Sequence, residues 1–311
     1  MNDLQKKPSF YQNPIVVILG ALLCCALWGS ATPFIKTGYE LLLPEKDVPS
    51  TILFAGIRFT LAGILTVLIY SIARGKVLYP KRENLPRVLI IAAFQTVIQY
   101  IFFYVGLSNT SGVKSAILSG SSAFFSVLVA SLVFRQEKLT TKKIIACLLG
   151  LVGIVLINLQ GLEFTMNFFG DAFVLFSTIS LSFSSVLMKR FSKHEDPVTL
   201  SGYQFIVGGI FMIAVGLIFG GKIVFNSLIG ILVLIYLALV SAVAYAVWGM
   251  LLKFNPVSKV TIFSFTTPIF GTLLSLIMLT ESSGVEPLNL ILTLILVSTG
   301  IFLLNYQKTG K

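Results

Sequence analysis

The side chains of this sequence that could act on another molecule are hydroxyls, amides and aromatic rings set within apolar stretches. Five serines recur at intervals of three and four residues, which places them on one helical face: Ser111, Ser115, Ser119, Ser122 and Ser126. Such a face could line the path of a polar solute with hydroxyl groups. Alternatively, these small residues allow close packing against a neighbouring helix. We take Ser119 and Ser122 as candidate binding residues.

A second apolar stretch carries amides and phenols. Gln95 and Gln99 share a face with Gly106, and Tyr100 and Tyr104 lie on a different face. A helix that is polar on two faces is expected to be surrounded by protein or a cavity, because exposing polar groups to lipid is costly. A glutamine both donates and accepts, which suits a zwitterionic or amide-bearing solute. Hydrogen bonding between helices is the alternative. Gln95, Gln99 and Tyr104 are candidates.

Aromatic residues form a third candidate surface. Ser241, Tyr245 and Trp248 follow one helical stripe, and the two aromatic side chains could stack on a ring or a cation of a solute. Alternatively, Trp248 belongs to the belt of aromatic residues at the membrane interface.

Another stretch is rich in hydroxyls around its whole circumference. We therefore predict an interior helix with Ser177 as its candidate binding residue. The hydroxyl residues are Ser177, Thr178, Ser180, Ser182, Ser184 and Ser185.

Two prolines lie inside apolar stretches. Pro33 follows Trp28 and Ser30, and Pro268 follows Ser264. An internal proline removes a helical hydrogen bond and clashes with the turn before it, so carbonyls one turn earlier are expected to be freed. Interrupted helices near the centre of a membrane are typical of solute sites, so we take Trp28, Ser30 and Ser264 as candidate binding residues. A kink that serves only packing is the alternative.

Arg58 is the only charged residue well inside an apolar stretch. It lies about seven residues from the predicted outer end, or roughly 10 Å at 1.5 Å per residue. Its side chain could extend to the outer interface, or it could pin helix contacts or attract a carboxylate. Glu137 and Glu281 are predicted at helix ends, where a carboxylate complements a helix N-terminus. We group these three with Pro33 and Pro268 as structural or gating residues.

The titratable residues argue against catalysis. Hydrolysis would need a Ser-His or Asp-Asp pair, or a metal site. The single histidine, His194, lies in a polar joint, and no Asp or Glu lies in the middle of an apolar stretch. Cys24, Cys25 and Cys147 lie within apolar stretches, as packing residues do. We therefore expect no enzyme, no metal site and no cofactor.

Positioning these residues requires membrane-spanning elements. Hydrophobic residues make up 56% of the chain, charged residues 11%, and mean hydropathy is +0.94, which excludes an ordinary soluble domain. Apolar stretches of about 20 residues can cross the ~30 Å hydrocarbon layer, and without strict alternation they favour helices over a barrel. The predicted spans are residues 14–36, 51–73, 88–107, 112–134, 144–160, 169–189, 198–220, 228–252, 258–279 and 288–306. The fifth is short, and the long joint over residues 37–50 could form an extra external element.

The net charge of +11 does not indicate nucleic acid, because of where the charges lie. If the N-terminus is cytoplasmic, 18 of the 23 Lys and Arg residues fall in inside joints and four in outside joints. This asymmetry follows the positive-inside rule. It predicts a multi-pass protein of the plasma membrane with an even number of crossings and both termini in the cytoplasm.

The chain repeats itself. Arg-Gln-Glu-Lys-Leu-Thr at 135–140 follows the fourth span, and Thr-Glu at 280–281 follows the ninth. Gly-Ile-Val-Leu-Ile-Asn at 153–158 closes the fifth span and Gly-Ile-Phe-Leu-Leu-Asn at 300–305 closes the tenth. Because each half has five helices, the halves must have opposite orientations. The predicted organisation is a cytoplasmic segment over residues 1–13, repeats over 14–160 and 161–306, and a cytoplasmic tail over 307–311.

These features resemble the drug/metabolite transporter superfamily, and specifically its EamA-type ten-helix transporters. The motifs that carry the resemblance are Trp28-Gly29-Ser30, Arg58-Phe59 with Ala62-Gly63, Glu137-Lys138-Leu139-Thr140 with Gly150 and Gly153, and more weakly Pro268 and Glu281. The sequence departs from the first half's pattern after Glu281, where Ser-Ser-Gly replaces Lys-Leu-Thr.

The resemblance implies an all-α polytopic membrane protein with ten transmembrane helices as two inverted five-helix repeats around a central cavity. Helices one, three, four, six, eight and nine would line that cavity, with the fifth and tenth outside. It also implies alternating-access transport of small organic solutes, often amino acids or related metabolites and frequently outward (export), as in members similar to aromatic amino acid exporters. The scarcity of internal charges favours neutral or zwitterionic solutes such as amino acids, by passive or exchange transport. A lipid-flipping or structural membrane protein is the alternative, and the sequence does not indicate an oligomeric state.

Overall fold

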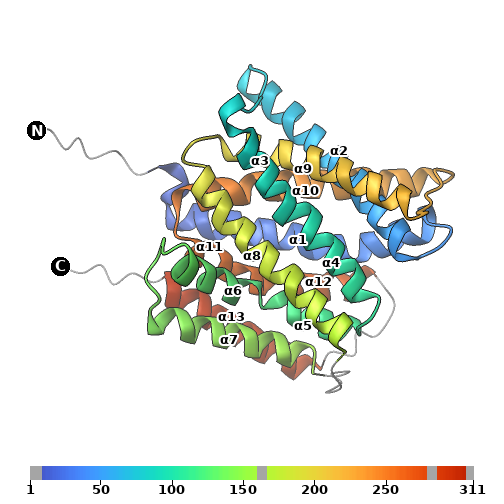
Figure 1. The fold of residues 1–311 in the computed structure, drawn as a ribbon. Helices are drawn as coiled ribbons and strands as arrows, with labels where there is room; N and C mark the ends of the chain where they lie inside the picture. The colour runs from blue at the N-terminus through green and yellow to red at the C-terminus, as the bar shows by residue number, and fades with distance from the viewer. Residues whose placement is uncertain (1–8, 160–166, 279–285, 306–311) are drawn as a thin grey trace, which may run out of the picture.

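The computed structural model describes residues 9–159, 167–278 and 286–305, and every regular element within them is helical (Figure 1). The prediction of an all-α membrane protein built from two inverted repeats is confirmed. Among the described residues, nine helices are long and apolar enough to cross a membrane. The helix α7 is the predicted short fifth span, with 17 residues.

The first half contains five crossings, three of them single helices and two composite. After the short η1 (Phe10–Gln12), the single helices are α1 (Pro14–Leu42), α2 (Val48–Arg74) and α7 (Thr141–Ile157). The third crossing joins η2 (Arg82–Asn84), α3 (Leu85–Ile91), the π-helical η3 (Ala92–Ile98) and α4 (Gln99–Leu107). The fourth joins α5 (Gly112–Gly120), α6 (Ser122–Leu128) and the π-helical η4 (Val129–Val133).

The second half also has three single helices and two composite crossings, but here the composite ones are its first and fourth. Its first crossing joins the π-helical η5 (Phe168–Ala172) to α8 (Phe173–Phe191). Its single helices are α9 (Pro197–Ile218), α10 (Leu228–Phe254) and α13 (Pro287–Asn305). Its fourth joins α11 (Val257–Thr261), the 3-10 segment η6 (Ile262–Thr266) and α12 (Thr267–Met278).

Polar residues at the joints determine where helices begin and end. The side chains of Asn13, Asp47 and Asp196 each accept a hydrogen bond from a free backbone N–H in the first turn of α1, α2 and α9. Gly75 ends α2 in the left-handed conformation with φ of 62°. The expectation of an extra element over residues 37–50 is wrong, because α1 continues to Leu42 and α2 begins at Val48.

Corresponding helices of the two halves pack against each other. The second and seventh crossings, α2 and α9, meet through glycines, and a Cβ at Gly63 would lie 2.5 Å from the carbonyl oxygen of Gly202. The fifth and tenth, α7 and α13, lie together along one side of the bundle, where Thr293 donates to the carbonyl of Gly153 (2.8 Å) (Figure 1). The helix α1 passes between α10 and α12.

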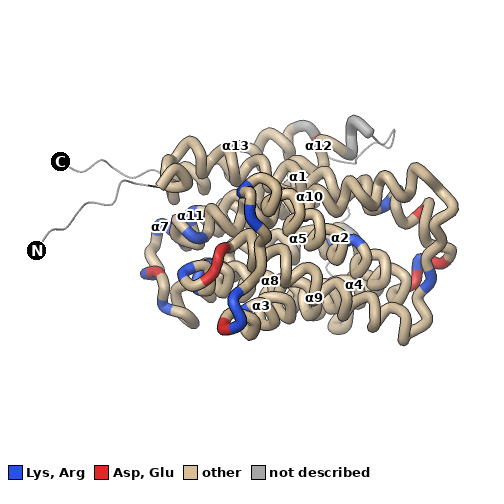
Figure 2. The backbone as a smooth tube through the Cα atoms, turned by 90° about the horizontal axis from the view of Figure 1, so that it is seen from above, with Lys and Arg blue, Asp and Glu red and all other residues tan. Residues whose placement is uncertain are grey.

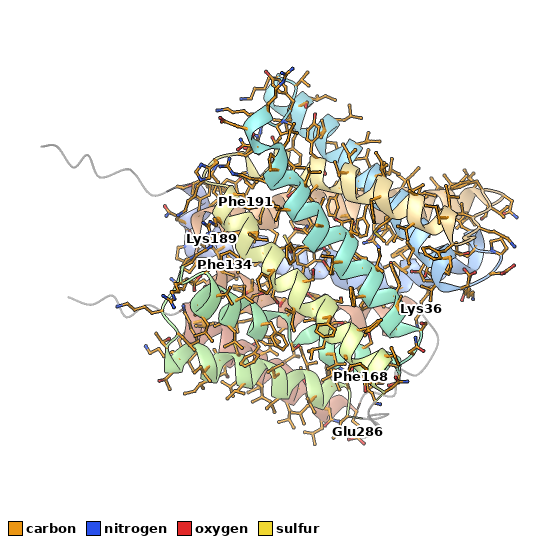
Figure 3. All side chains as sticks on the ribbon, in the orientation of Figure 1. Lys36, Phe134, Phe168, Lys189, Phe191 and Glu286 are labelled. Carbon is orange, nitrogen blue, oxygen red and sulfur yellow. The ribbon has the colours of Figure 1, made fainter. Side chains whose placement is uncertain are left out.

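Charged residues concentrate in the joints and at the ends of the helices, and the helices between them are largely uncharged (Figure 2). The start of α1 and the end of α13 lie at the same end of the bundle, as an even number of crossings requires (Figures 1 and 2). Lys189 lies at this end and Lys36 at the opposite end (Figure 3).

Candidate functional site

An aromatic cluster joins α1 to α10 inside the bundle. The Trp28 ring lies 5.1 Å from the Tyr245 ring and 5.0 Å from the Trp248 ring, both in edge-to-face geometry. Trp248 is 6% exposed, so its assignment to an interfacial belt is wrong. The indole N–H of Trp28 is buried and has no hydrogen-bond acceptor. The cluster therefore presents an unsatisfied donor among packed rings.

Arg58 points into the same interior region. Its side chain is 4% exposed, so the expectation that it extends to the outer interface is wrong. The guanidinium donates to the Ser241 hydroxyl of α10 (3.2 Å) and lies 4.6 Å from the centre of the Phe59 ring. Its Nε–H is buried without an acceptor. No ion pair in the described part of the chain includes Arg58.

Tyrosines lie near this guanidinium. The Phe59 ring beneath it lies 4.5 Å from the Tyr100 ring, which lies 6.0 Å from the Tyr104 ring. The Tyr39 hydroxyl is buried without a partner. The hydroxyls of Tyr100 and Tyr245 lie 3.4 Å apart and link the third crossing to the eighth. Of these tyrosines, sequence reasoning included Tyr104 and Tyr245 as candidates and missed Tyr39, which lies three turns beyond Trp28 in the same long helix.

The two candidate glutamines lie at and beside the π-helical segment η3. Gln95 is 3% exposed and Gln99 is 8% exposed. The amide nitrogen of Gln95 and the amide oxygen of Gln99 are both buried without partners. A π-helical turn inserts an extra residue and changes which side chains share a face, and such turns are frequent at functional sites. This feature was not evident from the sequence.

The candidate hydroxyls of the fourth and ninth crossings meet across the two halves. Ser122 and Ser264 lie 3.5 Å apart. Ser119 has a buried hydroxyl without a partner, and so does Thr267 at the start of α12. Sequence reasoning missed Thr267, although its place directly before Pro268 was a usable signal.

Other candidate hydroxyls are engaged in the packing of the protein. Ser30 donates to the carbonyl of Leu27 (2.7 Å) and contacts the Tyr236 hydroxyl (2.7 Å). In α8, Ser177 is buried, and five neighbouring hydroxyls bond to backbone carbonyls, which favours the packing interpretation for those five: Thr178, Ser180, Ser182, Ser184 and Ser185.

The two internal prolines have different effects. Pro33 lies within a helix that continues past it, and Gly29 allows close packing there because its Cβ position lies 2.8 Å from the backbone nitrogen of Gly271. Pro268 follows the 3-10 segment η6, in which the Ser264 hydroxyl donates to the Thr261 carbonyl (2.8 Å). Only the crossing that contains Pro268 departs from α-helical geometry at its proline.

Glu137 belongs to a separate cluster at the end of the bundle. Its carboxylate accepts from Lys143 Nζ (2.7 Å) and from both the backbone N–H (3.3 Å) and the hydroxyl of Ser258, so it bonds to the start of α11 in the other half. Burial raises its pKa, but the Lys143 and Ser258 hydrogen bonds outweigh burial and hold it below the ordinary value. Lys189 donates nearby to the carbonyls of Leu252 (3.2 Å) and Asn255.

Glu281 lies outside the described residues. Within the described ranges, no group of three His, Cys, Asp or Glu side chains is placed to hold a metal ion.

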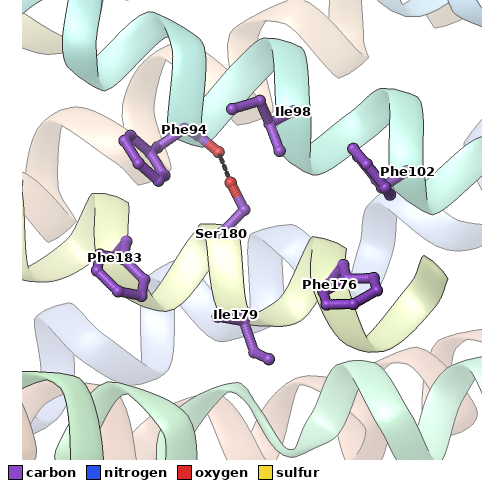
Figure 4. Close-up of a pocket in the computed structure, with 7 residues that line it drawn as sticks. All are labelled: Phe94, Ile98, Phe102, Phe176, Ile179, Ser180 and Phe183. Carbon is purple, nitrogen blue, oxygen red and sulfur yellow. Dashed lines mark hydrogen bonds between the residues drawn. The ribbon is translucent and has the colours of Figure 1, made fainter. Parts of the chain in front are cut away.

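A groove of about 280 Å³ lies apart from these residues, between the third crossing and α8 (Figure 4). Phenylalanines and isoleucines line it, and its one polar side chain, Ser180, donates to the Phe94 carbonyl (2.6 Å). Phe176 at its rim is 51% exposed, so the groove opens toward the outside of the bundle. None of the candidate binding residues contributes to it.

Of the residues described above, seven have a buried polar side-chain atom without a partner. They are Trp28, Tyr39, Arg58, Gln95, Gln99, Ser119 and Thr267. These residues come from α1, α2, η3, α4, α5 and α12, so both halves contribute. Unpaired polar groups in the interior are costly, and a polar ligand or water in contact with them would remove that cost.

Comparisons with known proteins identify the family of this chain and several relatives. The EamA-like transporter family matches the chain twice, over residues 15–159 and 168–306. An uncharacterized transporter of Archaeoglobus fulgidus is 27% identical over 83% of this chain and 88% of its own length. The uncharacterized transporter YvbV of Bacillus subtilis is 26% identical over 92% and 90%. A chloroplastic WAT1-related protein of Arabidopsis thaliana is 25% identical over 89% and 68%.

A solved crystal structure shares the fold, with a TM-score of 0.76 over 94% of this chain and 96% of the other at 17% identity.

Proposed function

This chain belongs to the EamA-like transporter family, and we propose that it moves amino acids or related neutral and zwitterionic metabolites across the plasma membrane by alternating access. Membership of this family makes it a membrane transport protein and not an enzyme. The proposal adds the class of solute, export or exchange as the mode, and the position of the site.

The observation that carries the proposal is the set of unpaired buried polar atoms around the centre. Donors from Trp28, Arg58 and Gln95 and the acceptor of Gln99 match the mixed hydrogen-bonding needs of a zwitterion. The aromatic rings of Trp28, Tyr245 and Trp248 add apolar surface beside them. Solute sites of secondary transporters lie where inverted repeats meet near the midplane.

The charges support a solute of low net charge. Arg58 is the buried cation of this region, and the described acidic residues that form ion pairs do so with other cations. A doubly charged anion would need more internal cations, and a dication would need an internal carboxylate. The Glu137 cluster is compatible with alternating access, because it joins the two halves at one end of the bundle by hydrogen bonds that a rearrangement of the halves could break.

The orientation follows from the positive joints, with both termini in the cytoplasm. The alternative function, lipid flipping, would need a polar track open to lipid. The groove in Figure 4 opens outward but is apolar, and the polar candidates lie elsewhere.

Counterflow in proteoliposomes tests the proposal. Vesicles preloaded with one amino acid at a time should accumulate a labelled one, with saturation. Trp28→Ala and Gln99→Ala should each reduce this exchange, while Glu45→Gln at an exposed ion pair should not. Absence of exchange with every amino acid, in vesicles that hold folded protein, overturns the amino-acid assignment. Movement of a labelled lipid between leaflets instead would support the alternative.

A further inference from the structure

Arg58 is a buried charge without a counter-charge. Its side chain is 4% exposed, and arginine does not lose its proton at physiological pH. A buried ion without a partner destabilises a protein by several kcal/mol in general, so such charges are almost always paired. The described ion pairs of this chain all involve other residues. The burial of Arg58 therefore destabilises the folded protein, and no acidic residue of the described chain offsets this effect.

The contacts that Arg58 does make leave much of its hydrogen-bonding capacity unused. A guanidinium has five N–H donors. One N–H group donates to Ser241, whose own hydroxyl donates to the Leu237 carbonyl (3.1 Å). The ring of Phe59 covers one face of the guanidinium, and the Nε–H has no acceptor. The remaining donors suit a planar acceptor such as a carboxylate, which can accept two parallel hydrogen bonds.

Nearby tyrosines add neutral donors. The Phe59 ring beneath the guanidinium lies 4.5 Å from the Tyr100 ring, and the Tyr100 hydroxyl lies 3.4 Å from that of Tyr245. A phenol can donate to an anion without changing the charge of the site. One permanent positive charge with neutral donors matches a single carboxylate better than a phosphate dianion. Tyr245 also contacts the Trp28 ring, so the charged site and the aromatic cluster are continuous.

We propose that Arg58 binds the carboxylate of the transported solute, with the hydroxyls of Tyr100 and Tyr245 as additional donors. The rings of Trp28 and Tyr245 then lie where they can attract the ammonium group of an α-amino acid by cation–π interaction. This inference rests on the proposed transport function and deepens it, because it names the solute group that is recognised and the residue that recognises it.

The test compares solutes that differ at one group. Purified full-length protein in detergent is heated with L-phenylalanine, with phenylalaninamide, with 3-phenylpropionate or with sodium chloride of equal ionic strength. A ligand that binds the folded state raises the melting temperature. We expect a shift with L-phenylalanine and a smaller one with 3-phenylpropionate. The amide and the salt should give no shift.

Substitutions then locate the effect. Arg58→Gln should weaken binding of L-phenylalanine about tenfold or more, and Arg58→Lys should recover part of it, because the charge returns without the planar geometry. Lys222→Gln, at an exposed ion pair, is the control that should bind normally. Without ligand, Arg58→Gln should melt at or above the temperature of the original protein, since it removes an unpaired charge. That readout also shows that the variant folds.

The outcomes separate the two proposals. Equal shifts with the amide and the acid, an unchanged affinity in Arg58→Gln, or no shift with any carboxylate each overturn the carboxylate assignment. An equal shift with sodium chloride would assign an inorganic anion instead. If 3-phenylpropionate binds through Arg58 and no amino acid exchanges in vesicles, the carboxylate assignment stands and the amino-acid transport proposal fails.

Discussion

The region around Arg58 and the cluster around Glu137 contain similar groups but differ in how far the chain itself satisfies their charges. Each contains a buried charge and hydroxyls from the other half of the molecule. At Glu137 the carboxylate meets a lysine, a hydroxyl and a backbone N–H. At Arg58 the guanidinium meets one hydroxyl and one ring, and its Nε–H has no acceptor.

This difference distinguishes residues that stabilise the fold from residues whose hydrogen-bonding groups are available to a ligand. A charge whose partners are all within the chain stabilises the folded state. Removing one partner leaves the other charge buried and unpaired, which destabilises the protein. A polar group without a partner contributes little to stability, and its retention needs another explanation. The predictions below test whether the two regions differ in this way.

Glu137→Ala should have the largest effect on stability. The Glu137 and Lys143 side chains are 7% and 14% exposed, so the substitution leaves a nearly buried lysine unpaired. We expect a loss of about 3 to 5 kcal/mol in the free energy of unfolding. Denaturation in mixed micelles measures it. Glu45→Ala, in a pair with exposures of 61% and 64%, should cost less than about 1 kcal/mol. Equal losses in both variants would contradict the structural role of Glu137.

Ser258→Ala should have a smaller effect in the same cluster. It removes one hydroxyl donor and leaves the Lys143 ion pair and the backbone N–H in place. We expect a loss of about 1 to 3 kcal/mol, as for hydrogen bonds to charged groups. Combining it with Glu137→Ala in a double-mutant cycle should give a loss smaller than the sum. Additive losses would show that the two residues act independently.

Gln99→Leu should change stability by less than about 1 kcal/mol or increase it, because its amide oxygen has no partner to lose. The matched control is Gln204→Leu, which removes the acceptor of the Thr96 hydroxyl (2.7 Å) and should cost more. In counterflow the order should be the opposite, with a larger loss of transport in Gln99→Leu than in Gln204→Leu. A large loss of stability in Gln99→Leu would contradict the distinction between groups without partners and the bonded groups at Glu137.

The smallest effect is the pH dependence of stability at the end of the bundle. Because the folded-state pKa of Glu137 lies below the ordinary value, its contribution is complete above the unfolded-state pKa of about 4.3 and is lost as pH falls through the folded value. The melting temperature of the original protein should therefore fall more steeply below pH 4.3 than that of Glu137→Gln. Parallel curves would show that the carboxylate does not titrate with unfolding.

The fold could be predicted from the sequence because its main determinants are local. The length of each apolar stretch and the polar joints between them specify ten helices, and the spacing of motifs specifies the repeat. The candidate residues were identified by type and span, but not by environment. Whether Arg58 extends outward or inward depends on α10, and Trp248 is buried because Trp28 lies against it. Such contacts between distant segments leave no periodic signal.

Two further features depend on the folded chain in the same way. The π-helical geometry at Gln95 is not evident from composition, since the same residues would continue an α-helix. The partner of Glu137 lies 121 positions away at Ser258, so only the fold shows that the carboxylate joins the two halves.

The 3-10 segment η6 makes the crossing that contains Pro268 longer than a continuous α-helix of the same residues would be. Its five residues, Ile262–Thr266, rise by about 2.0 Å each where an α-helix rises by 1.5 Å. Conversion of the segment to α-helix would shorten the crossing by about 2.5 Å. Since a 3-10 helix turns 120° per residue and an α-helix 100°, it would also rotate α12 relative to α11 by about 100°. A screw motion of this kind would redirect the unpaired Thr267 hydroxyl while both ends of the crossing stay near their joints.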